Sequence, residues 1–390
     1  MPIATGPSRW TILALLFVAR VGLSLQFQTM GSVADPLVGD LHLTFTEIGT
    51  LIGLFMLPGI FLAIPAGLAG RYAPDRILAA TGLATLAVGG FVAASADGFA
   101  GLAAGRLICG LGFVLTSLYF TKMVVDWFAG REIATAMAVL VMSWPFGIAM
   151  GQVGHSWLAA THGWRWPFVV ASAYCLVVAC LLFLAYRPPP AAATAPAAPS
   201  MRLTGREWTL TLIAAIVWSS FNAAYVVYLS FAPRVLVAAG DTPLHAASVI
   251  SLASWVMIFS ATLCGQVADR TGRSDLIMTV CMLFAIASLV LLPQPGWAVA
   301  LSLVFGLIGV APAGIMMALT GAAMAPQKRA FGMGVFLSVY FLGSAVAPGL
   351  AGRMYDRSHD AFMPILFAAA LFALTLLAYF GFRLAQRRLP

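Results

Sequence analysis

The sequence predicts an all-α membrane protein with twelve transmembrane helices in two pseudo-symmetric halves of six, on the basis of three observations. Of the 390 residues, 62% are hydrophobic and 9% are charged, and the mean hydropathy is +0.97, which is more apolar surface than a water-soluble core can hide. The apolar residues come in runs of roughly 20, the length that a helix needs to cross a bilayer. A polar stretch also divides the chain into two parts whose sequences repeat each other.

The apolar runs give the order of the helices. The first run is too long for the apolar region of a signal peptide and no small-residue cleavage site follows it, so we expect it to be retained as the first helix. The five cysteines fall inside apolar runs without metal-ligand spacing, so we expect no metal site, no cofactor and no disulfide framework. The predicted helices span residues 10–34, 47–70, 77–96, 100–123, 132–158, 165–186, 207–236, 245–268, 275–293, 297–320, 330–352 and 361–382.

The central break YRPPPAAATAPAAPSMRLTGRE is rich in Pro and Ala, which is the composition of a linker. We therefore expect an N-terminal six-helix half at residues 1–186, a cytoplasmic linker at 187–206 and a C-terminal six-helix half at 207–390. The stretches ATAMAVLVMSWPFG and AFGMGVFLSVYFLG align at a constant offset between the halves. The aligned pairs are Met137 with Met333, Val139 with Val335, Trp144 with Tyr340 and Gly147 with Gly343.

The cations set the expected orientation. The net charge of +8 comes from Lys and Arg in short loops, with no basic stripe of interleaved aromatics, so we exclude nucleic acid as a partner. Positive charge collects on the cytoplasmic side of membrane proteins, which predicts both termini inside, in the cell inner membrane. The expected inside cations are Arg9, Arg71, Arg76, Lys122, Arg131, Arg187, Arg202, Arg206, Arg270, Arg273, Lys328, Arg329, Arg383, Arg387 and Arg388, against Arg165, Arg234, Arg353 and Arg357 outside.

The five histidines fall at outer helix ends or in outer loops. We interpret them as interfacial polar residues, with a pH sensor or a metal site as the alternatives. They are His42, His155, His162, His245 and His359.

The first helix carries a cation in its apolar stretch. Arg20 lies ten residues after Trp10, about 15 Å into the membrane at a rise of about 1.5 Å per residue. An arginine at such a depth costs roughly 2.5 to 3.5 kcal/mol on insertion scales and usually faces a cavity or a partner. Ser24 and Gln28 follow at i+4 and i+8 and share its helix face.

No acidic residue falls at the same depth. All thirteen lie at helix ends or in loops: Asp35, Asp40, Glu47, Asp97, Asp241, Asp356 and Asp360 outside, and Asp75, Asp126, Glu132, Glu207, Asp269 and Asp275 inside. Since an unpaired buried charge is costly, we interpret the missing counter-ion of Arg20 as a substrate anion, which a planar guanidinium binds through paired hydrogen bonds. Alternatively, Arg20 binds backbone carbonyls at a broken helix, or an acid that the tertiary structure brings close.

Aromatic and amide side chains on other helices are candidates for the same site. A small anion suits a compact cavity with aromatic walls and a few hydrogen-bond donors, and each aromatic taken alone has helix packing as its alternative. Equivalent positions of two repeats tend to meet at the centre, which favours Trp144 and Tyr340. The remaining candidates are Trp218, Asn222, Tyr225 and Trp255.

A loop motif follows the eighth predicted helix. GQVADRTGRSD resembles the loop signature G-x-x-x-D-R-x-G-R of the major facilitator superfamily, which that family places after its second and eighth helices. The matching residues are Gly265, Asp269, Arg270, Gly272 and Arg273. We interpret them as a conformational latch, in which Gly265 permits close helix approach and Asp269 caps a neighbouring helix.

The first half departs from this loop pattern. GLAGRYAPDR keeps Arg71, but no acid stands at the aspartate position of the motif. On the fourth helix, Arg106, Gly110 and Gly112 resemble the family's R-x-x-x-G-x-G pattern, which the family links to helix architecture and in some members to proton coupling. We give Arg106 a lesser chance of substrate contact than Arg20.

The resemblance implies a monomeric secondary transporter that works by alternating access, with its substrate between the two halves near mid-membrane. The general residue pattern of the first helices is similar to that of the family's small-anion branch, which includes cyanate permeases. We therefore expect a small inorganic or organic anion as substrate, with Arg20 as its main contact. Efflux of a lipophilic neutral compound is the alternative, while a membrane enzyme or a receptor has less support because no catalytic cluster or appended soluble domain is visible. Direction of transport and coupling stay open.

Overall fold

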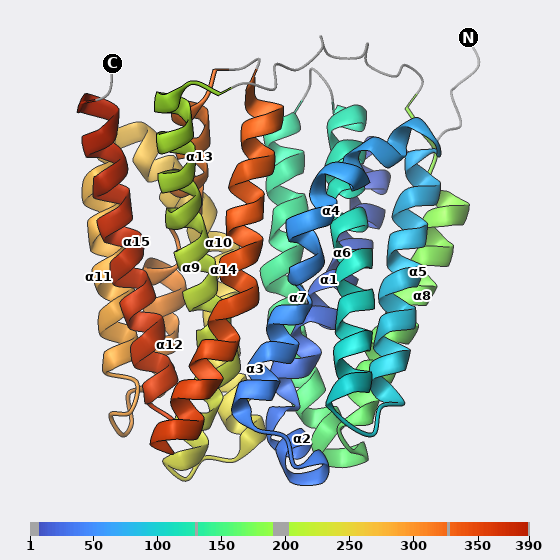
Figure 1. Cartoon of the computed structure of the whole chain (residues 1–390), viewed down its shortest axis with the longest axis vertical. Coiled ribbons are helices and arrows are strands. Elements are labelled where there is room, and N and C mark those ends of the chain that lie inside the picture. The colour runs from blue at the N-terminus through green and yellow to red at the C-terminus, as the bar shows by residue number, and fades with distance from the viewer. Residues whose placement is uncertain (1–7, 129–131, 190–202, 326–327, 389–390) are drawn as a thin grey trace.

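The computed structural model describes residues 8–128, 132–189, 203–325 and 328–388 as a bundle of long, roughly parallel helices (Figure 1). In this part of the chain, eleven helices are long and apolar enough to cross a membrane, and Ser274–Val290 is a shorter apolar helix of 17 residues. The elements are α1 (Arg9–Ser32), α2 (Ala34–Leu41), α3 (Phe45–Leu54), α4 (Leu57–Leu68), η1 (Ala69–Arg71), α5 (Asp75–Ala94), α6 (Phe99–Phe128), α7 (Ile133–His162), α8 (Arg165–Ala185), α9 (Gly205–Ala238), α10 (Pro243–Thr271), α11 (Ser274–Val290), α12 (Ala298–Val304), η2 (Phe305–Gly309), α13 (Ala313–Ala323), α14 (Arg329–Ser358) and α15 (Met363–Arg388).

The all-α fold predicted from the sequence is confirmed, with two predicted helices interrupted and the first ending two residues early. The 47–70 run divides into α3 and α4 at Phe55 and Met56, and the 297–320 run divides around the π-helical turn η2. The first run ends at Ser32, and the chain continues as the short helix α2, which ends at His42 in the left-handed conformation with φ 53°. Hydropathy shows how long each apolar run is. It does not show where the backbone leaves the regular α-helical conformation within the run.

His155 corrects the interfacial interpretation of the histidines. Its side chain is 3% exposed, and its Nδ1 has no hydrogen-bond partner in the structure. The reason is that α7 continues to His162 instead of ending near residue 158. His155 therefore lies inside the bundle, about two helical turns before the helix end.

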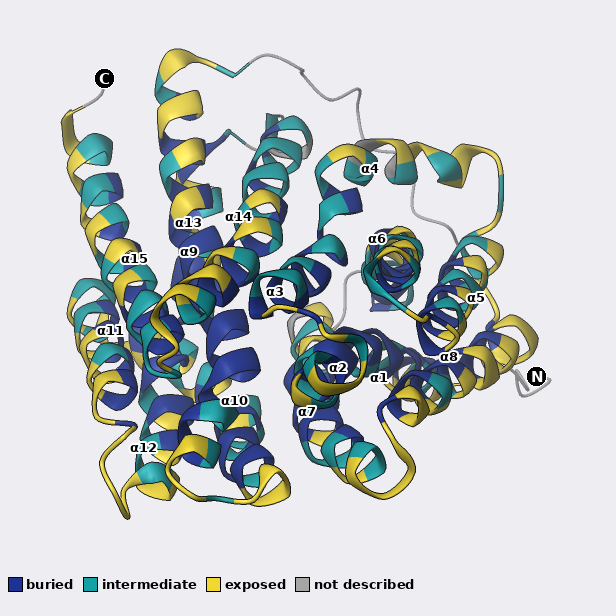
Figure 2. Cartoon of the chain, turned by 60° about the horizontal axis from the view of Figure 1, so that its bottom comes forward, coloured by how far each residue is buried: buried dark blue, intermediate teal, exposed yellow. Residues whose placement is uncertain are grey.

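Exposed residues lie on the outer faces of the bundle, as α8 and α11 show in Figure 2. Many of them are large and apolar: Phe61 is 71% exposed, and Leu184 and Leu377 are each 70% exposed. Water would penalise such surfaces, whereas hydrocarbon tails would cover them. The chain is a multi-pass membrane protein whose outer faces have the apolar composition of a lipid-facing surface.

A close contact occurs twice in the bundle, at equivalent positions of the sequence repeat. Ser24 on α1 donates to the carbonyl of Ser143 on α7 at 3.4 Å, and a Cβ on Gly147 would overlap its Oγ. Ser219 on α9 donates to the carbonyl of Val339 on α14 at 3.2 Å. A Cβ on Gly343 would overlap the Ser219 Oγ in the same way. We therefore propose that residues 1–186 and 207–390 are structural repeats.

The two ends of the bundle differ. We call the end where α1 begins and α15 ends the terminal end, and the opposite end, which carries α2 and the start of α3, the distal end (Figure 1). Near the distal end α3 packs against α14 so closely that a Cβ on Gly53 would overlap the Ala345 carbonyl oxygen, and a Cβ on Gly49 that of Pro348. The polar contacts that join α1–α8 to α9–α15 there are Gln152 with Leu229, Asp35 with Arg234, and Asp356 with Phe45 and Thr46. The distal end is therefore closed.

Candidate functional site

Arg20 on α1 lies within the bundle and makes one hydrogen bond. Its Nη1 donates to the carbonyl oxygen of Leu140 on α7 at 2.9 Å. Its Nε is buried without a partner, and no described carboxylate forms an ion pair with it. A guanidinium carries five N–H donors, so most of the hydrogen-bonding capacity of Arg20 is unused.

Tyr340 on α14, a helix of the other half, lies within electrostatic range of the Arg20 guanidinium. Tyr340 is only partly buried, and its ring contacts those of Trp218 on α9, with centroids 6.4 Å apart, and Phe341, at 5.0 Å. Arg20 and these rings are therefore contributed by three helices, α1, α9 and α14.

A second set of rings lies on the α7 side of Arg20. Phe17, one helical turn before Arg20, contacts Phe146 at 5.7 Å. Phe146 in turn contacts Trp255 on α10 at 5.5 Å. Trp144, two residues earlier on α7, contacts Phe113 on α6 at 5.7 Å. These rings come from both halves, and we name the set Phe17, Phe113, Trp144, Phe146, Trp218, Trp255, Tyr340 and Phe341 the central aromatic cluster.

Sequence analysis selected four members of this cluster and missed the four phenylalanines. Phe17 had a usable signal, because it lies three residues before Arg20 and so shares its helix face. Trp144 and Tyr340, which we expected to meet, are linked only indirectly, through two of the missed rings, Phe113 and Phe341, whose centroids are 6.5 Å apart. Phenylalanine is frequent in this chain, so its composition alone gave no reason to single these residues out.

Ser24 and Gln28 share the face of α1 that contacts α7. Ser24 is fully buried and donates to backbone carbonyls of Val21 and Ser143. Gln28 donates its Nε2 to the Oε1 of Gln152 and to Ser32 Oγ, the latter at 3.3 Å. The hydrogen atoms of both side chains are thus engaged by protein in this arrangement.

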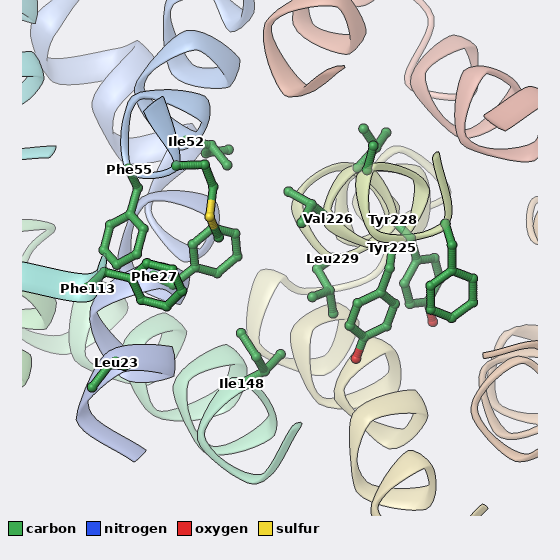
Figure 3. Close-up of a cluster of buried hydrophobic side chains, with 14 of the residues drawn as sticks. Leu23, Phe27, Ile52, Phe55, Phe113, Ile148, Tyr225, Val226, Tyr228 and Leu229 are labelled. Carbon is green, nitrogen blue, oxygen red and sulfur yellow. The ribbon is translucent and has the colours of Figure 1, made fainter. Parts of the chain in front are cut away.

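Asn222 and Tyr225 have different surroundings. Asn222 is partly exposed and donates Nδ2 to the backbone carbonyl of Trp218, one turn earlier on α9, at 2.8 Å. Tyr225 is buried and shares a 2.7 Å hydrogen bond with Ser254, with its ring stacked on Tyr228. Figure 3 shows Tyr225 and Tyr228 on α9, apart from Phe27, Phe55 and Phe113 on the other half. Tyr225 therefore packs within its own half.

Arg106 on α6 has its hydrogen bonds satisfied by protein, in contrast to Arg20. It donates to the carbonyls of Leu51, Gln26 and Phe27 at 3.1, 2.8 and 3.3 Å. Its guanidinium also lies over the Phe55 ring, 4.6 Å from the centroid. Arg106 thereby holds α1 and α3 against α6.

The two glycines of the same motif permit close helix packing. A Cβ on Gly110 would lie 2.5 Å from the Phe55 carbonyl oxygen, and one on Gly112 would overlap the Gly82 carbonyl oxygen. Both contacts require glycine because a larger residue would push α6 away from α3 and α5. The whole motif therefore positions helices around the site.

The residues of the expected latch lie at the terminal end. Gly272 ends α10 with φ 64°, where glycine avoids strain. Asp269, Arg270 and Arg71 are exposed, and no described atom comes within 4 Å of a Cβ built on Gly265. The close helix approach expected at Gly265 is therefore not present in this arrangement.

Acids at the first turns of two helices anchor the same end. Asp275 at the start of α11 accepts hydrogen bonds from Tyr379 at 2.7 Å and Arg383 at 2.8 Å on α15. Asp75 at the start of α5 pairs with Lys122 on α6. The motif-based interpretation centred on Asp269 and missed these contacts, which join helices distant in sequence. Within the described ranges, no three His, Cys, Asp or Glu side chains form a group that could hold a metal ion.

Comparison with known proteins agrees with this architecture. The family model described as Major Facilitator Superfamily matches residues 13–348. The chain is 24% identical to a hexuronate transporter of Bacillus subtilis (strain 168), covering 95% of this chain and 94% of that protein. It is 25% identical to a 3-(3-hydroxy-phenyl)propionate transporter of Escherichia coli (strain K12), covering 88% and 86%. These relatives are transporters, not enzymes.

Among solved structures, the fold is similar to that of a bacterial homolog of the human lysosomal transporter Spinster, in an inward-facing and occupied conformation. The TM-score is 0.79, with 17% sequence identity over 98% of both chains. At this identity the likeness concerns the fold alone.

Proposed function

The chain belongs to the major facilitator superfamily, and as a secondary transporter of this family we propose that it carries a small anion, in first place an organic carboxylate, across the membrane by alternating access. Arg20 is its main electrostatic contact. The observation that carries this proposal is the unused hydrogen-bonding capacity of Arg20 inside the bundle, with a buried Nε that has no partner.

A carboxylate fits this arginine for a physical reason. A guanidinium donates two parallel N–H bonds to the two oxygens of a carboxylate, which gives both strength and orientation. The bound anion would also neutralise a charge whose burial is otherwise costly. Tyr340 and Trp218, on the opposite half, are the side chains that we propose contact the remainder of the ligand, which their mutual ring contact supports.

The names of the relatives support a carboxylate substrate. Hexuronate and 3-(3-hydroxy-phenyl)propionate, in the names of the two transporters, both carry one carboxylate on a ring-containing or polyhydroxylated body. Aromatic side chains bind the faces of sugars and phenyl rings, so the central aromatic cluster suits either body. Small inorganic anions such as cyanate are a second group within the same proposal.

The central aromatic cluster also favours one alternative function. Partly exposed rings such as Trp144 and Trp255 beside few polar groups would accept a lipophilic neutral compound, as in drug efflux. The two functions differ in what they require of Arg20, because a neutral ligand gains little from a guanidinium.

Alternating access assigns a role to the closed distal end. We propose that the present arrangement is one of two access states, in which α3 and α14 block passage at the distal end. The repeat contacts at Ser24 and Ser219 support a rocking motion of two similar halves. We further propose a monomer in the inner membrane, with the terminal end cytoplasmic and the distal end outside.

Thermal unfolding of the purified protein in mild detergent tests the proposal. The ligand panel is D-glucuronate, 3-(3-hydroxyphenyl)propionate, the neutral amide of the latter, cyanate and tetraphenylphosphonium. A ligand at 100 times its Kd should stabilise the folded protein by about 2.7 kcal/mol. We expect a carboxylate to raise the midpoint of the wild type, the matching amide not to, and Arg20→Gln to lose most of the shift.

Arg76→Gln is the matched control, because Arg76 lies at the terminal end over the Phe183 ring and outside the central aromatic cluster. The ligand-induced rise of its thermal unfolding midpoint should equal that of the wild type. Stabilisation by the neutral amide equal to that by the acid, undiminished in Arg20→Gln, would contradict the anion proposal and favour efflux of neutral compounds. Uptake of the stabilising ligand into proteoliposomes then establishes transport.

A further inference from the structure

A cavity lies near the distal end, apart from Arg20. It has a volume of about 150 Å³ and is lined by residues of α1, α2, α7, α9 and α10, so both halves contribute. Water occupies roughly 30 Å³ per molecule in the liquid, so the cavity has room for the carboxylate end of a larger ligand. The polar residues of its lining are Ser32, Asp35, Gln152, Ser156, Ser230 and Arg234.

Arg234 is the cation of this lining, and the protein holds its guanidinium in place. Its Nη2 donates to the hydroxyl of Tyr355 at 2.9 Å. The guanidinium lies 3.9 Å from the Phe45 ring centroid and 4.7 Å from that of Tyr355. These contacts involve the ring faces and one nitrogen, and the Nε of Arg234 is buried without a partner. Arg234 therefore has donor capacity left for an anion.

Asp35 supplies the anion that Arg234 contacts in the present arrangement. The two side chains form an ion pair between α2 and α9, and Asp35 is 46% exposed whereas Arg234 is 19% exposed. Because Asp35 is half-exposed, water already competes for this ion pair, and an incoming carboxylate can compete with Asp35 in the same way. Asp356, the other nearby acid, is engaged by the N–H groups of Phe45 and Thr46 at 2.9 and 2.7 Å.

We propose that this cavity is a second carboxylate-binding site, at which Arg234 binds the anion and Asp35 takes its place when no substrate is bound. The inference rests on the proposed carboxylate transport and adds a site at the distal end. Substrate binding there displaces Asp35 and breaks the Asp35–Arg234 ion pair, one of the polar contacts between the halves. The site thus couples substrate arrival or departure to opening of the distal end.

The other polar groups of the cavity fit a polyhydroxylated acid. The hydroxyls of Ser156 and Ser230 donate to carbonyls of their own helices, both at 2.8 Å. Their oxygen lone pairs are left to accept hydrogen bonds from ligand hydroxyls. D-glucuronate is therefore the probe of choice.

Equilibrium dialysis with radiolabelled D-glucuronate tests the second site in the Arg20→Gln background, which weakens the central site. We expect the wild type to bind more tightly than Arg20→Gln, and Arg20→Gln to keep a weaker, saturable site. Adding Asp35→Asn should tighten that remaining site about threefold to fivefold, because it removes a weak competitor. Adding Arg234→Gln should abolish it. Asp40→Asn, a charge loss on the same helix at an exposed residue, is the matched control and should leave the affinity unchanged.

The following outcomes would contradict the second carboxylate-binding site. Residual binding that neither Asp35→Asn nor Arg234→Gln alters overturns it, as does a complete loss of binding in Arg20→Gln, and both leave the proposed transport function intact. Absence of carboxylate binding to the wild type overturns the second site and the carboxylate function together. If the Arg234→Gln protein does not fold, the Asp35→Asn comparison decides alone.

Discussion

Arg20 on α1 and Leu140 on α7 are joined by a hydrogen bond of 2.9 Å between a guanidinium Nη1 and a backbone carbonyl oxygen. The contact orients the guanidinium without neutralising it. A fixed but uncompensated charge inside a membrane protein is unfavourable for stability. It is favourable for binding an anion, since the cost of orientation is met before the ligand arrives.

Arg20→Met is therefore expected to stabilise the ligand-free protein while it abolishes carboxylate binding. Replacing an uncompensated buried charge by an apolar side chain of similar length should gain about 2 kcal/mol. Thermal unfolding without ligand measures the gain, and dialysis measures the loss. A drop in the midpoint would show that Arg20 serves mainly to hold α1 against α7.

Arg106→Met is expected to act in the opposite direction. This side chain donates to three backbone carbonyls and lies over Phe55, so its removal should destabilise the protein by about 3 kcal/mol. The same unfolding assay, run beside Arg20→Met, gives the comparison. An unchanged midpoint, or a selective loss of ligand binding in a stable protein, would transfer the binding role to Arg106.

Gly53→Val is expected to prevent closure of the distal end. A Cβ at Gly53 would overlap the Ala345 carbonyl oxygen, and an overpacking penalty of about 2 kcal/mol shifts a two-state equilibrium about thirtyfold. A single cysteine at Ser156, in a background without native cysteines, should become reactive toward an impermeant maleimide, and uptake should fall.

Gly39→Ala is the control for this substitution, because nothing lies within 4 Å of a Cβ at Gly39. It should leave labelling and uptake unchanged. Labelling at Ser156 that is equally slow in Gly53→Val and the wild type would mean that the α3–α14 contact does not govern access.

Gly147→Ala and Gly343→Ala are expected to destabilise the protein by similar amounts, about 1 to 3 kcal/mol each, because each Cβ meets a serine Oγ at equivalent positions. Ser24→Ala should relieve Gly147→Ala, and Ser219→Ala should relieve Gly343→Ala. Double-mutant cycles on thermal unfolding measure the coupling. Additive effects in both pairs would remove this support for two structural repeats.

Several site residues were recognisable in the sequence because their signal is local. Arg20 stands out by its depth in an apolar run, and Trp144 and Tyr340 by their equivalent places in the repeat. The roles of Ser24, Gln28 and Tyr225 were not visible, because their hydrogen-bond partners Ser143, Gln152 and Ser254 lie on other helices. Sequence spacing gives the face of a helix but not the helix that it meets.

The sequence by itself determined the membrane class, the apolar segments and the absence of an acid at the depth of Arg20. Hydropathy, helix rise and the inventory of charges are properties of the chain taken in order, so no folding information is needed for them. The tertiary structure alone decided that Arg20 contacts Leu140, that phenylalanines complete the central aromatic cluster and that Arg234 pairs with Asp35. These contacts join residues far apart in the chain, and packing between helices, which local sequence does not encode, brings them together.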